Sequence, residues 1–351
     1  MNLKVSTPTL YDVAAASGVS TATVSRCLNF PDQVAEQTRR KVTKAIGDLG
    51  YSPNFGAKAM AARRTNTIGA IIPTMENAIF ARGLQAFQEE LRRHGFTMLV
   101  ASTAYRPDIE QEQIHALVAR GADGLLLIGH ERDPEIYRFL EAQGVPALVT
   151  WAYEPQSKQP SIGFDNRGAM RGMAAEVIKL GHRRLALISA ETAINDRAAE
   201  RHNGIQDAMI AAGLNTNDLN FVETTYGIEQ GARAFEELMS SDPSVTAVFC
   251  GNDVLAVGAL RRARELGIAV PDDVSIIGFD DIELAQVAFP ALTTVHVPHR
   301  EMGRLAGLAL AEMVKDGKPF DTIELSASPV FRDTLAAPPL VQREGRYPRK
   351  V

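Results

Sequence analysis

Short apolar runs alternate with longer amphipathic segments from residue 67 to residue 280, and this alternation constrains the fold more than any other feature. Seven runs rich in Val, Ile and Leu are predicted strands: TIGAIIP, FTMLVAS, GLLLIG, PALVTW, RLALIS, AVFCG and VSIIGFD. Helical patterns such as FARGLQAFQEELRRHG and VLAVGALRRARELG separate them. Strands of this composition with helices between them predict parallel sheets that are covered on both faces. The pattern is too long for one sheet, and we expect a break near Asp165.

The bulk composition narrows the class of protein. A chain of 351 residues predicts two or three domains, and 45% apolar with 23% charged residues is typical of a soluble globular protein. We expect no membrane span, because no run of 18 uncharged apolar residues occurs, and no secretory signal. The two cysteines, Cys27 and Cys250, lie far apart. They suit a reducing cytoplasm and argue against a disulfide scaffold.

Charge is distributed unevenly along the chain. Residues 1–65 contain nine Lys or Arg and four acidic residues, a net charge of +5. The remaining residues carry −10, since the whole chain carries −5. A small basic head on a large acidic body predicts a polyanionic partner for the head alone. The alternative is a chance clustering of solvated basic residues.

The head predicts a helix-turn-helix. The segment TLYDVAAASG forms the first helix, with Thr9 as its N-cap and Gly18 just past its end. Ser20 can cap a second helix that buries Val24. Small and apolar residues occupy the positions that close helix crossing, the turn and the core require: Ala14, Gly18, Val19 and Val24.

The second helix has the composition of a recognition helix. Such a helix must approach base edges closely, so short side chains are expected on its outer face. Thr21, Ala22 and Arg26 fall on that face; arginine can fork onto guanine, and alanine can contact a thymine methyl group. The other hydroxyl and amide groups suit phosphate oxygens, namely Ser20, Thr23, Ser25 and Asn29. The alternative is an exposed helix with incidental serines and threonines.

A third helix is predicted in EQTRRKVTKAIGDLGY, ending at Gly50. Ala35 precedes it and cannot cap it, which costs about 1 kcal/mol unless Asp32 or a water substitutes. Residues 53–65 are small and basic and have no apolar stripe. They are either a flexible linker or a helix that forms only on DNA and inserts Met60 into the minor groove.

The segments TLYDVAAASGVSTATVSRCLN and TRRKVTKAIGDLGYSPN resemble the head of the lactose-repressor (LacI) family of bacterial transcription regulators. The resemblance extends along nearly the whole chain, to about Pro339. It implies an N-terminal all-α helix-turn-helix headpiece and an α/β periplasmic-binding-protein-like body of two Rossmann-like subdomains with parallel sheets. The implied boundaries are 1–52 for the DNA-binding domain, 53–65 for the hinge, 66–340 for the body and 341–351 for a tail. Within the body, residues 66–164 and 294–326 form one subdomain, and residues 165–293 and 327–340 form the other.

The resemblance also assigns functional residues. Met60 occupies the position where relatives usually carry the leucine that wedges open a base step. The full set of DNA contacts expected is Thr9, Leu10, Tyr11, Ser20, Thr21, Ala22, Thr23, Ser25, Arg26, Asn29, Tyr51, Asn54, Ala57 and Met60. The expected effector cleft contains Phe80, Trp151, Asp165, Arg201, Asn252 and Asp280. This mixture of groups suits a sugar, a sugar acid or a nucleoside.

Several of these assignments have alternatives. Asp165 could only cap the following helix, and Asp281 could also be a helix cap. Trp151 could equally have a core or a surface role. The body could instead be a sugar-binding receptor or a sugar-processing enzyme, with Asp280 and Asp281 as a catalytic pair. No phosphate loop, G-x-S-x-G or His-Glu-x-x-His motif occurs, and the seven histidines lack metal-ligand spacing. We therefore expect no catalysis, no cofactor and no metal.

The expected function is sequence-specific repression or regulation of transcription in the cytoplasm. A single recognition helix covers few base pairs, so a homodimer on a near-palindromic double-stranded operator is expected. The tail LVQREGRYPRK lacks the heptads that build tetramers in some relatives. A small-molecule effector would change operator affinity through its different affinity for two states of the body, either releasing DNA or retaining it.

Overall fold

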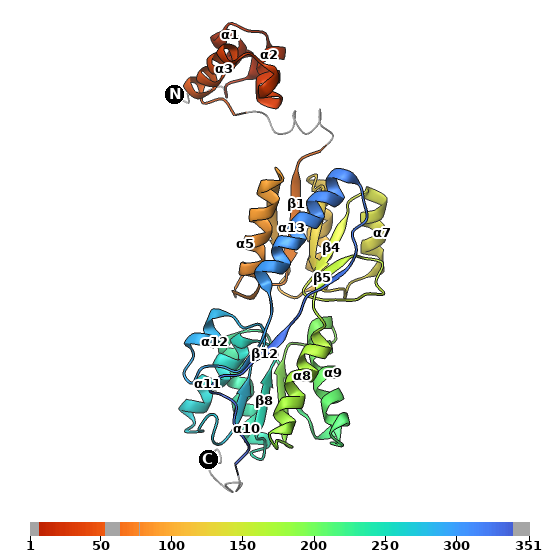
Figure 1. Ribbon diagram of the computed structural model, residues 1–351, viewed down its shortest axis with the longest axis vertical. Helices are drawn as coiled ribbons and strands as arrows, with labels where there is room; N and C mark the ends of the chain where they lie inside the picture. The colour runs from red at the N-terminus through yellow and green to blue at the C-terminus, as the bar shows by residue number, and fades with distance from the viewer. Residues whose placement is uncertain (1–6, 53–63, 77, 340–351) are drawn as a thin grey trace. The chain divides into compact units, whose positions relative to one another are not determined.

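The computed structural model describes residues 7–52, 64–76 and 78–339. It divides into two compact units, Met1–Thr65 and Asn66–Val351 (Figure 1). We call the first unit the head and the second the body, and each is described by itself.

The head is a small helical domain. It contains α1 (Leu10–Ser17), α2 (Thr21–Asn29), a 3-10 turn η1 (Pro31–Gln33) and α3 (Glu36–Leu49). Val13, Val24 and Val42 are fully buried between the three helices. The turn between α1 and α2 contains Gly18 at φ 67°, a left-handed conformation that a side chain would disfavour. The predicted helix-turn-helix and third helix are confirmed.

The predicted weakness at the start of α3 is also present. Ala35 is its N-cap and no side chain bonds the free backbone amides. The suggestion that Asp32 substitutes as a cap is wrong, because its carboxylate lies 3.8 Å from the Arg39 guanidinium instead.

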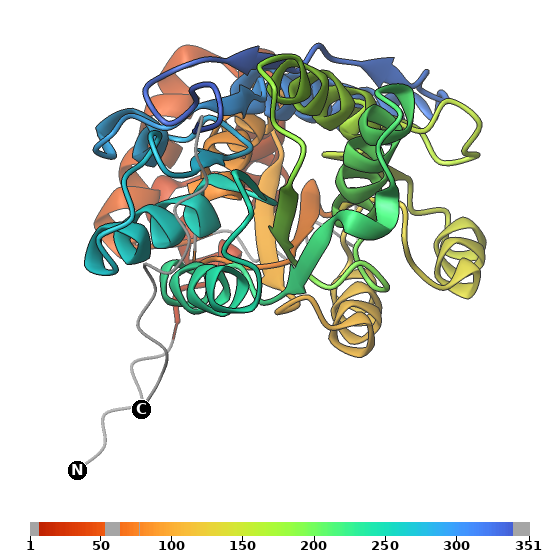
Figure 2. The ribbon, with the colours of Figure 1, turned by 90° about the horizontal axis from the view of Figure 1, so that it is seen from below.

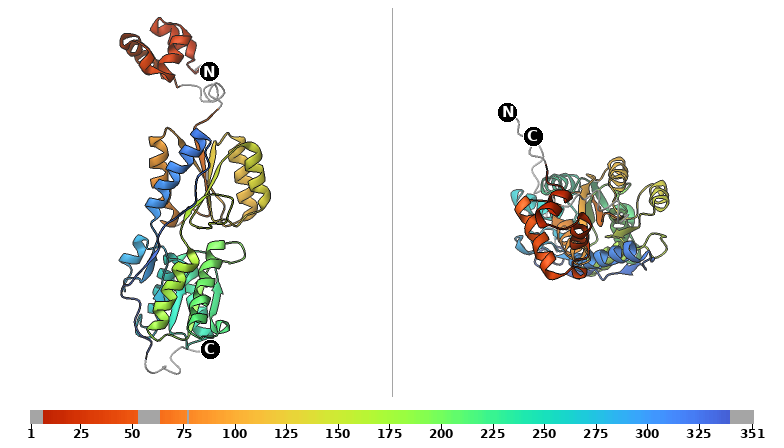
Figure 3. Two further views of the ribbon diagram at one scale, coloured as in Figure 1. Left: turned by 45° about the vertical axis from the view of Figure 1, so that its right-hand side comes forward. Right: turned by 90° about the horizontal axis from the view of Figure 1, so that it is seen from above.

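The body contains two parallel sheets. We call the part around the larger sheet the first lobe (residues 66–163 and 299–324) and the part around the smaller sheet the second lobe (residues 165–296 and 328–339). Figure 3 shows both sheets with their helices. The chain crosses between the lobes after residue 163, before residue 299 and after residue 324.

The first lobe has six parallel strands. Their order is β11 (Ile323–Glu324), β5 (Ser161–Gly163), β4 (Ala147–Thr150), β3 (Gly124–Ile128), β1 (Thr67–Ile72) and β2 (Thr97–Ser102). One face packs against α5 (Ala78–Arg93) and α13 (His299–Asp316), which lie side by side. The other face packs against α6 (Pro107–Ala119) and α7 (Pro134–Gln143).

The second lobe has four parallel strands in the order β7 (Asn220–Glu223), β6 (Leu185–Ser189), β8 (Ala247–Cys250) and β9 (Ser275–Ile277). The helices α8 (Asn166–Lys179) and α9 (Asp196–Ala211) pair with each other, as do α10 (Ile228–Ser241) and α11 (Asp253–Glu265) (Figure 2). A 3-10 turn η2 (Thr216–Asp218) precedes β7, and a short helix α12 (Glu283–Val287) follows β9. Two antiparallel strands, β10 (Thr294–His296) and β12 (Ser328–Val330), complete it.

All seven predicted strands are strands in the structure, and the predicted fold class is confirmed. The sequence did not predict β5, β7, β10, β11 and β12, which are four residues long or shorter. Each of these five segments contains only one or two Val, Ile, Leu or Phe residues, so none forms an apolar run in the sequence.

Candidate nucleic-acid interface and ligand cleft

The recognition helix α2 presents its polar side chains outward. Its buried side contains Val24 and Cys27, while Ala22, Arg26 and Asn29 are exposed. Thr21, Thr23 and Ser25 are half-buried at the edges of the exposed face. The Arg26 guanidinium forms no hydrogen bond or ion pair with the described residues.

Capping groups fix the start of both helices of this motif. The Ser20 hydroxyl accepts a hydrogen bond from the Thr23 amide at 3.2 Å. Thr9 and Asp12 form a reciprocal capping box at the start of α1. These bonds occupy the hydroxyls of Ser20 and Thr9, so any phosphate contact by them adds to a structural role.

The remaining predicted DNA contacts have different surroundings. Tyr11 is 76% exposed. Leu10 and Tyr51 are half-buried and pack against the core of the head. Asn54, Ala57 and Met60 lie outside the described residues, as does most of the predicted hinge.

A hollow opens between the two lobes of the body. Residues of the first lobe and residues of the second lobe line it: Pro73, Thr103, Tyr105, Arg106, Pro107, Glu110, Ile128, Glu131, Ile194, Asp196 and Arg197. Its walls follow the ends of β1, β2 and β3 in the first lobe and the start of α9 in the second. This is the edge of parallel sheets at which ligands bind in open α/β folds.

Arg201 is buried on α9 and is held by three groups of the second lobe. Its Nη1 donates to Asn166 Oδ1 at 2.8 Å and its Nη2 to the Tyr226 hydroxyl at 2.9 Å. Its guanidinium carbon lies 4.9 Å from the centre of the Phe279 ring. Its Nε bonds no atom of the described residues. A guanidinium fixed in this way can bind an oxygen with little loss of side-chain entropy.

Asp280 follows β9 in an unusual backbone conformation, at φ 104°, and its side chain is buried. Burial raises its pKa to about 7, against the opposing charges of Arg201 and Arg197. The loop is fixed by Asp253, whose carboxylate accepts from the Ile282 amide at 2.8 Å and from the Thr294 hydroxyl at 2.5 Å. A strained backbone with a buried, perturbed carboxyl is typical of a functional site.

Asp281, the next residue, has a structural role. Its carboxylate accepts from Arg332 at 2.6 Å and lies 2.9 Å from His296 Nδ1. The N-cap of α12 is Ile282, which makes no side-chain cap bond, so Asp281 is not the helix cap considered above. The two adjacent aspartates therefore have different partners.

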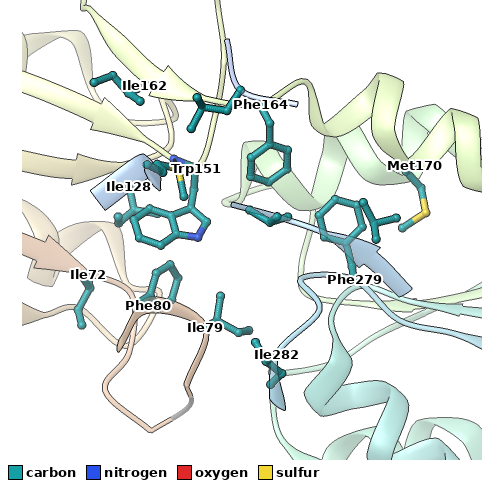
Figure 4. Packing of buried hydrophobic residues seen from close by; sticks show 14 of the residues in the cluster. Ile72, Ile79, Phe80, Ile128, Trp151, Ile162, Phe164, Met170, Phe279 and Ile282 are labelled. Carbon is teal, nitrogen blue, oxygen red and sulfur yellow. Dashed lines mark hydrogen bonds between the residues drawn. The ribbon is translucent and has the colours of Figure 1, made fainter. Parts of the chain in front are cut away.

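Phe80 and Trp151 pack against each other in the core of the first lobe (Figure 4). Both side chains are buried, and their rings meet edge to face at 5.2 Å. Trp151 Nε1 bonds no atom of the described residues. A surface role for Trp151 is therefore excluded, and its indole belongs to the core that borders the cleft.

Asp165 and Asn252 both cap helices. Asp165 is exposed and accepts from the Gly168 amide at 2.8 Å. Its neighbour Asn166 is the buried one, and it bonds both Arg201 and the Trp151 carbonyl. Asn252 is buried, its Oδ1 accepts from the Leu255 amide, and its Nδ2 bonds no atom of the described residues.

None of the six predicted effector residues is among the residues that line the hollow. Tyr105 and Arg197, which line it, were not predicted, and neither were Asn166 and Tyr226, which bond Arg201. Tyr105 follows β2 at φ 60°, and its ring lies 5.5 Å from that of Tyr226 in the other lobe. Burial raises the pKa of Tyr105, with a further contribution from Tyr226. No local motif marks these residues, and only Asn166 had a signal, through its place beside Asp165.

The described residues contain no group of three or more His, Cys, Asp or Glu side chains that could hold a metal ion. None of the helices in the described ranges is both long enough and apolar enough to cross a bilayer.

These features define a class of protein, a helix-turn-helix domain joined to a two-lobed ligand-binding body. The profile "Bacterial regulatory proteins, lacI family" matches residues 9–54, and the profile "Periplasmic binding protein-like domain" matches residues 174–335. The HTH-type transcriptional regulator GntR of Escherichia coli (strain K12) is 32% identical over 313 residues, 89% of this chain and 94% of that protein. The HTH-type transcriptional repressor PurR of Vibrio vulnificus is 32% identical over 332 residues, 93% of this chain and 98% of that protein.

Solved structures of lacI-family regulators are also similar to this chain. A lacI-family regulator from Silicibacter pomeroyi aligns with a TM-score of 0.85 at 28% identity, over 94% of this chain and 99% of that one. The lac repressor dimer bound to operator and an anti-inducer aligns with a TM-score of 0.82 at 26% identity, over 94% of this chain and 100% of that one. A complex of the regulator CelR with cellobiose aligns with a TM-score of 0.68 at 30% identity, over 93% of this chain and 99% of that one. The chain belongs to the lacI family and is a DNA-binding transcriptional regulator.

Proposed function

We propose that a small polar molecule binds between the lobes and controls how tightly the head holds operator DNA. The observation that carries this proposal is a set of three buried donors that bond no atom of the described residues: Arg201 Nε, Asn252 Nδ2 and Trp151 Nε1. Leaving a buried donor unpaired is costly, so a ligand that accepts these hydrogen bonds would gain affinity. The apolar wall of Phe80 and the carboxyl of Asp280 complete a site of the kind that binds sugars, sugar acids or nucleosides.

The ligand contacts that we propose come from the six predicted residues, which we assign to three different roles. Arg201, Asn252 and Asp280 are direct contacts, and Phe80 and Trp151 form the apolar wall. Asp165 contributes by capping α8, which places Asn166 against Arg201.

We also propose that two copies of the chain act together on DNA. One recognition helix covers too few base pairs for useful specificity, and the related lac repressor was solved as a dimer on operator. The body has exposed apolar side chains that a second copy could cover, including Val287 at 76% and Phe289 at 91% exposed. Dimerisation would set the spacing of the two heads.

We assign a separate function to each segment of the chain, with the predicted domain boundaries. Residues 1–52 read DNA, residues 53–65 form a hinge that inserts Met60, and residues 66–340 bind the effector and the second copy. Met60→Gly should weaken operator binding while leaving effector affinity unchanged. An equal loss of both would instead indicate misfolding.

A thermal-shift screen of the full chain against sugars, sugar acids and nucleosides tests the ligand proposal. A bound compound raises the melting temperature by mass action, by an amount that grows with its concentration. The hit should lose its effect in Asn252→Ala and should change the gel-shift affinity for promoter DNA in the wild-type chain. A hit that stabilises Asn252→Ala equally would place the ligand elsewhere.

A further inference from the structure

The side chain of Asp196, the first residue of α9 in the second lobe, bonds the backbone of the first lobe. Its Oδ2 accepts from the His130 amide at 2.5 Å and from the Glu131 amide at 3.3 Å. Both amides follow β3, so these bonds join one lobe to the other across the hollow. We call Asp196, Arg197, Gly129 and the two amides the clasp.

The other carboxylate oxygen holds Arg197. Arg197 Nη1 donates to Asp196 Oδ1 at 2.8 Å, and its side chain is 10% exposed. Burial opposes the ionisation of Asp196, but Arg197 and the His130 amide outweigh it and lower its pKa. The carboxylate is therefore charged at neutral pH, and hydrogen bonds to a charged acceptor are stronger than neutral ones.

Gly129 makes this approach possible. It has φ 73°, and an added Cβ would overlap the Arg197 guanidinium and lie 2.5 Å from Asp196 Oδ1. The two side chains therefore use the space that the missing side chain of residue 129 leaves free. The backbone and the side chains on the two sides of the hollow are complementary in shape as well as in charge.

Another ion pair between the lobes is weaker. Arg82 on α5 lies 3.2 Å from Glu283 on α12, and the two side chains are 43% and 81% exposed. Exposed pairs of this kind contribute little because water screens them. The Asp196 bond to the His130 amide is shorter, at 2.5 Å, and the Asp196 side chain is only 20% exposed. Both Asp196 bonds are directed at backbone amides, which follow directly after the β3 strand.

We propose that Asp196 is a positioning residue that holds the cleft closed and aims Arg197 at its interior. Arg197 lines the hollow together with Tyr105, so the closing contact and the ligand-facing cation are adjacent in the chain and bonded to each other. The effect of the clasp on ligand binding rests on the proposed ligand cleft. A ligand must enter while the clasp is open, and the clasp then stabilises the closed complex. Weakening it would shift the body toward an open state before any ligand binds.

Hydrogen exchange of the ligand-free full chain tests the clasp without knowledge of the effector. In the wild-type protein the His130 and Glu131 amides should exchange slowly. In Asp196→Ala they should exchange at least about tenfold faster, because opening then breaks no charge-assisted bond. Asp196→Asn keeps an acceptor but loses the charge and should fall between the two. Amides within β3 report on the folding of the first lobe and should not change.

Asp207→Asn is the matched control. Asp207 lies on the same helix and accepts two hydrogen bonds from Arg167 of α8, within the second lobe. It should leave exchange at residues 130 and 131 unchanged. Equal acceleration in the control, or no acceleration in Asp196→Ala, would overturn the proposal.

A second variant keeps the test decisive if Asp196→Ala fails to fold. Gly129→Ala blocks the clasp from the other lobe and should produce the same fast exchange at residues 130 and 131. Protected amides in that variant would contradict the proposal. Because hydrogen exchange is measured without ligand, a failed effector screen would not affect the conclusion about the clasp. Likewise, an exchange result that contradicts the clasp would not affect the result of the effector screen.

Discussion

The DNA-reading face of the head and the ligand cleft of the body place their arginines in opposite surroundings. Arg26 is exposed and its guanidinium bonds none of the described residues, whereas Arg201 is 7% exposed and its guanidinium bonds Asn166 and Tyr226. In the proposed DNA contact, the head needs only short exposed side chains on a well-capped helix, because DNA would supply their partners. The cleft needs buried polar groups that hold one another and leave a few donors for the ligand. The predictions below test this difference.

The largest expected effect is a change in the stability of the body with pH, caused by the ionisation of Asp280. Burial raises the pKa of Asp280 to about 7 in the folded body, well above the ordinary value of an aspartate. The unfolded chain ionises this group at lower pH, so its contribution to stability is present in acid and is lost as pH rises toward 7. Relative to Asp280→Asn, the wild-type body should lose on the order of 4 kcal/mol between pH 4 and pH 8, measured by urea unfolding.

Asp281→Asn is the control for this prediction, because it should show the opposite sign. Burial opposes its ionisation, but Arg332 and His296 lower its pKa. Its contribution is therefore present at neutral pH and is lost as pH falls. Parallel pH profiles for wild type and Asp280→Asn would show that the Asp280 carboxyl is not buried in solution.

Arg201→Ala should abolish most of the ligand affinity. The substitution removes the fixed guanidinium and leaves Asn166 and Tyr226 without their partner, a loss of about 3 kcal/mol in binding. Calorimetry with the strongest compound from the screen measures it. Arg167→Ala, which breaks a pair of α8 and α9 outside the cleft, should have no such effect. An unchanged affinity in Arg201→Ala would remove Arg201 from the site.

Arg26→Ala should relax operator specificity at one base position by about 1–3 kcal/mol. Gel-shift titration over single-base variants of the operator measures it. The exposed guanidinium bonds no group in the described part of the chain, so its removal should not change the fold of the head. Arg40→Ala, on α3 and paired with Glu36, is the control. Uniform weakening across all operator variants would make Arg26 a phosphate contact instead.

The smallest expected effect is an increase in the stability of the head. Ala35→Ser should stabilise the head by about 1 kcal/mol, because α3 begins without a side-chain cap. Thermal melting followed by circular dichroism measures it. Ala16→Ser, at an exposed position within α1, controls for the added hydroxyl. No gain would mean that a water already satisfies the first amides of α3.

The contrast between head and cleft also explains which residues sequence analysis found. Thr9, Ser20 and Gly18 were predictable because caps and turns depend on neighbours in the chain, and the structure confirms each. Family resemblance supplied Arg201, Asn252 and Asp280, which are buried in the structure. Asn166 and Tyr226 were missed, because they lie 35 and 25 positions from Arg201 in the sequence and meet it only in the folded body.

The sequence by itself determined the three helices of the head, the seven principal strands and the parallel arrangement of the sheets. Periodicity and capping act over a few residues, where the chain has few conformations to choose from. Only the tertiary structure decided that Asn166, rather than Asp165, meets Arg201, and that Asp196 bonds the His130 amide of the other lobe. Those contacts depend on how lobes and helices pack, and packing is set by the summed burial of many side chains distant in sequence.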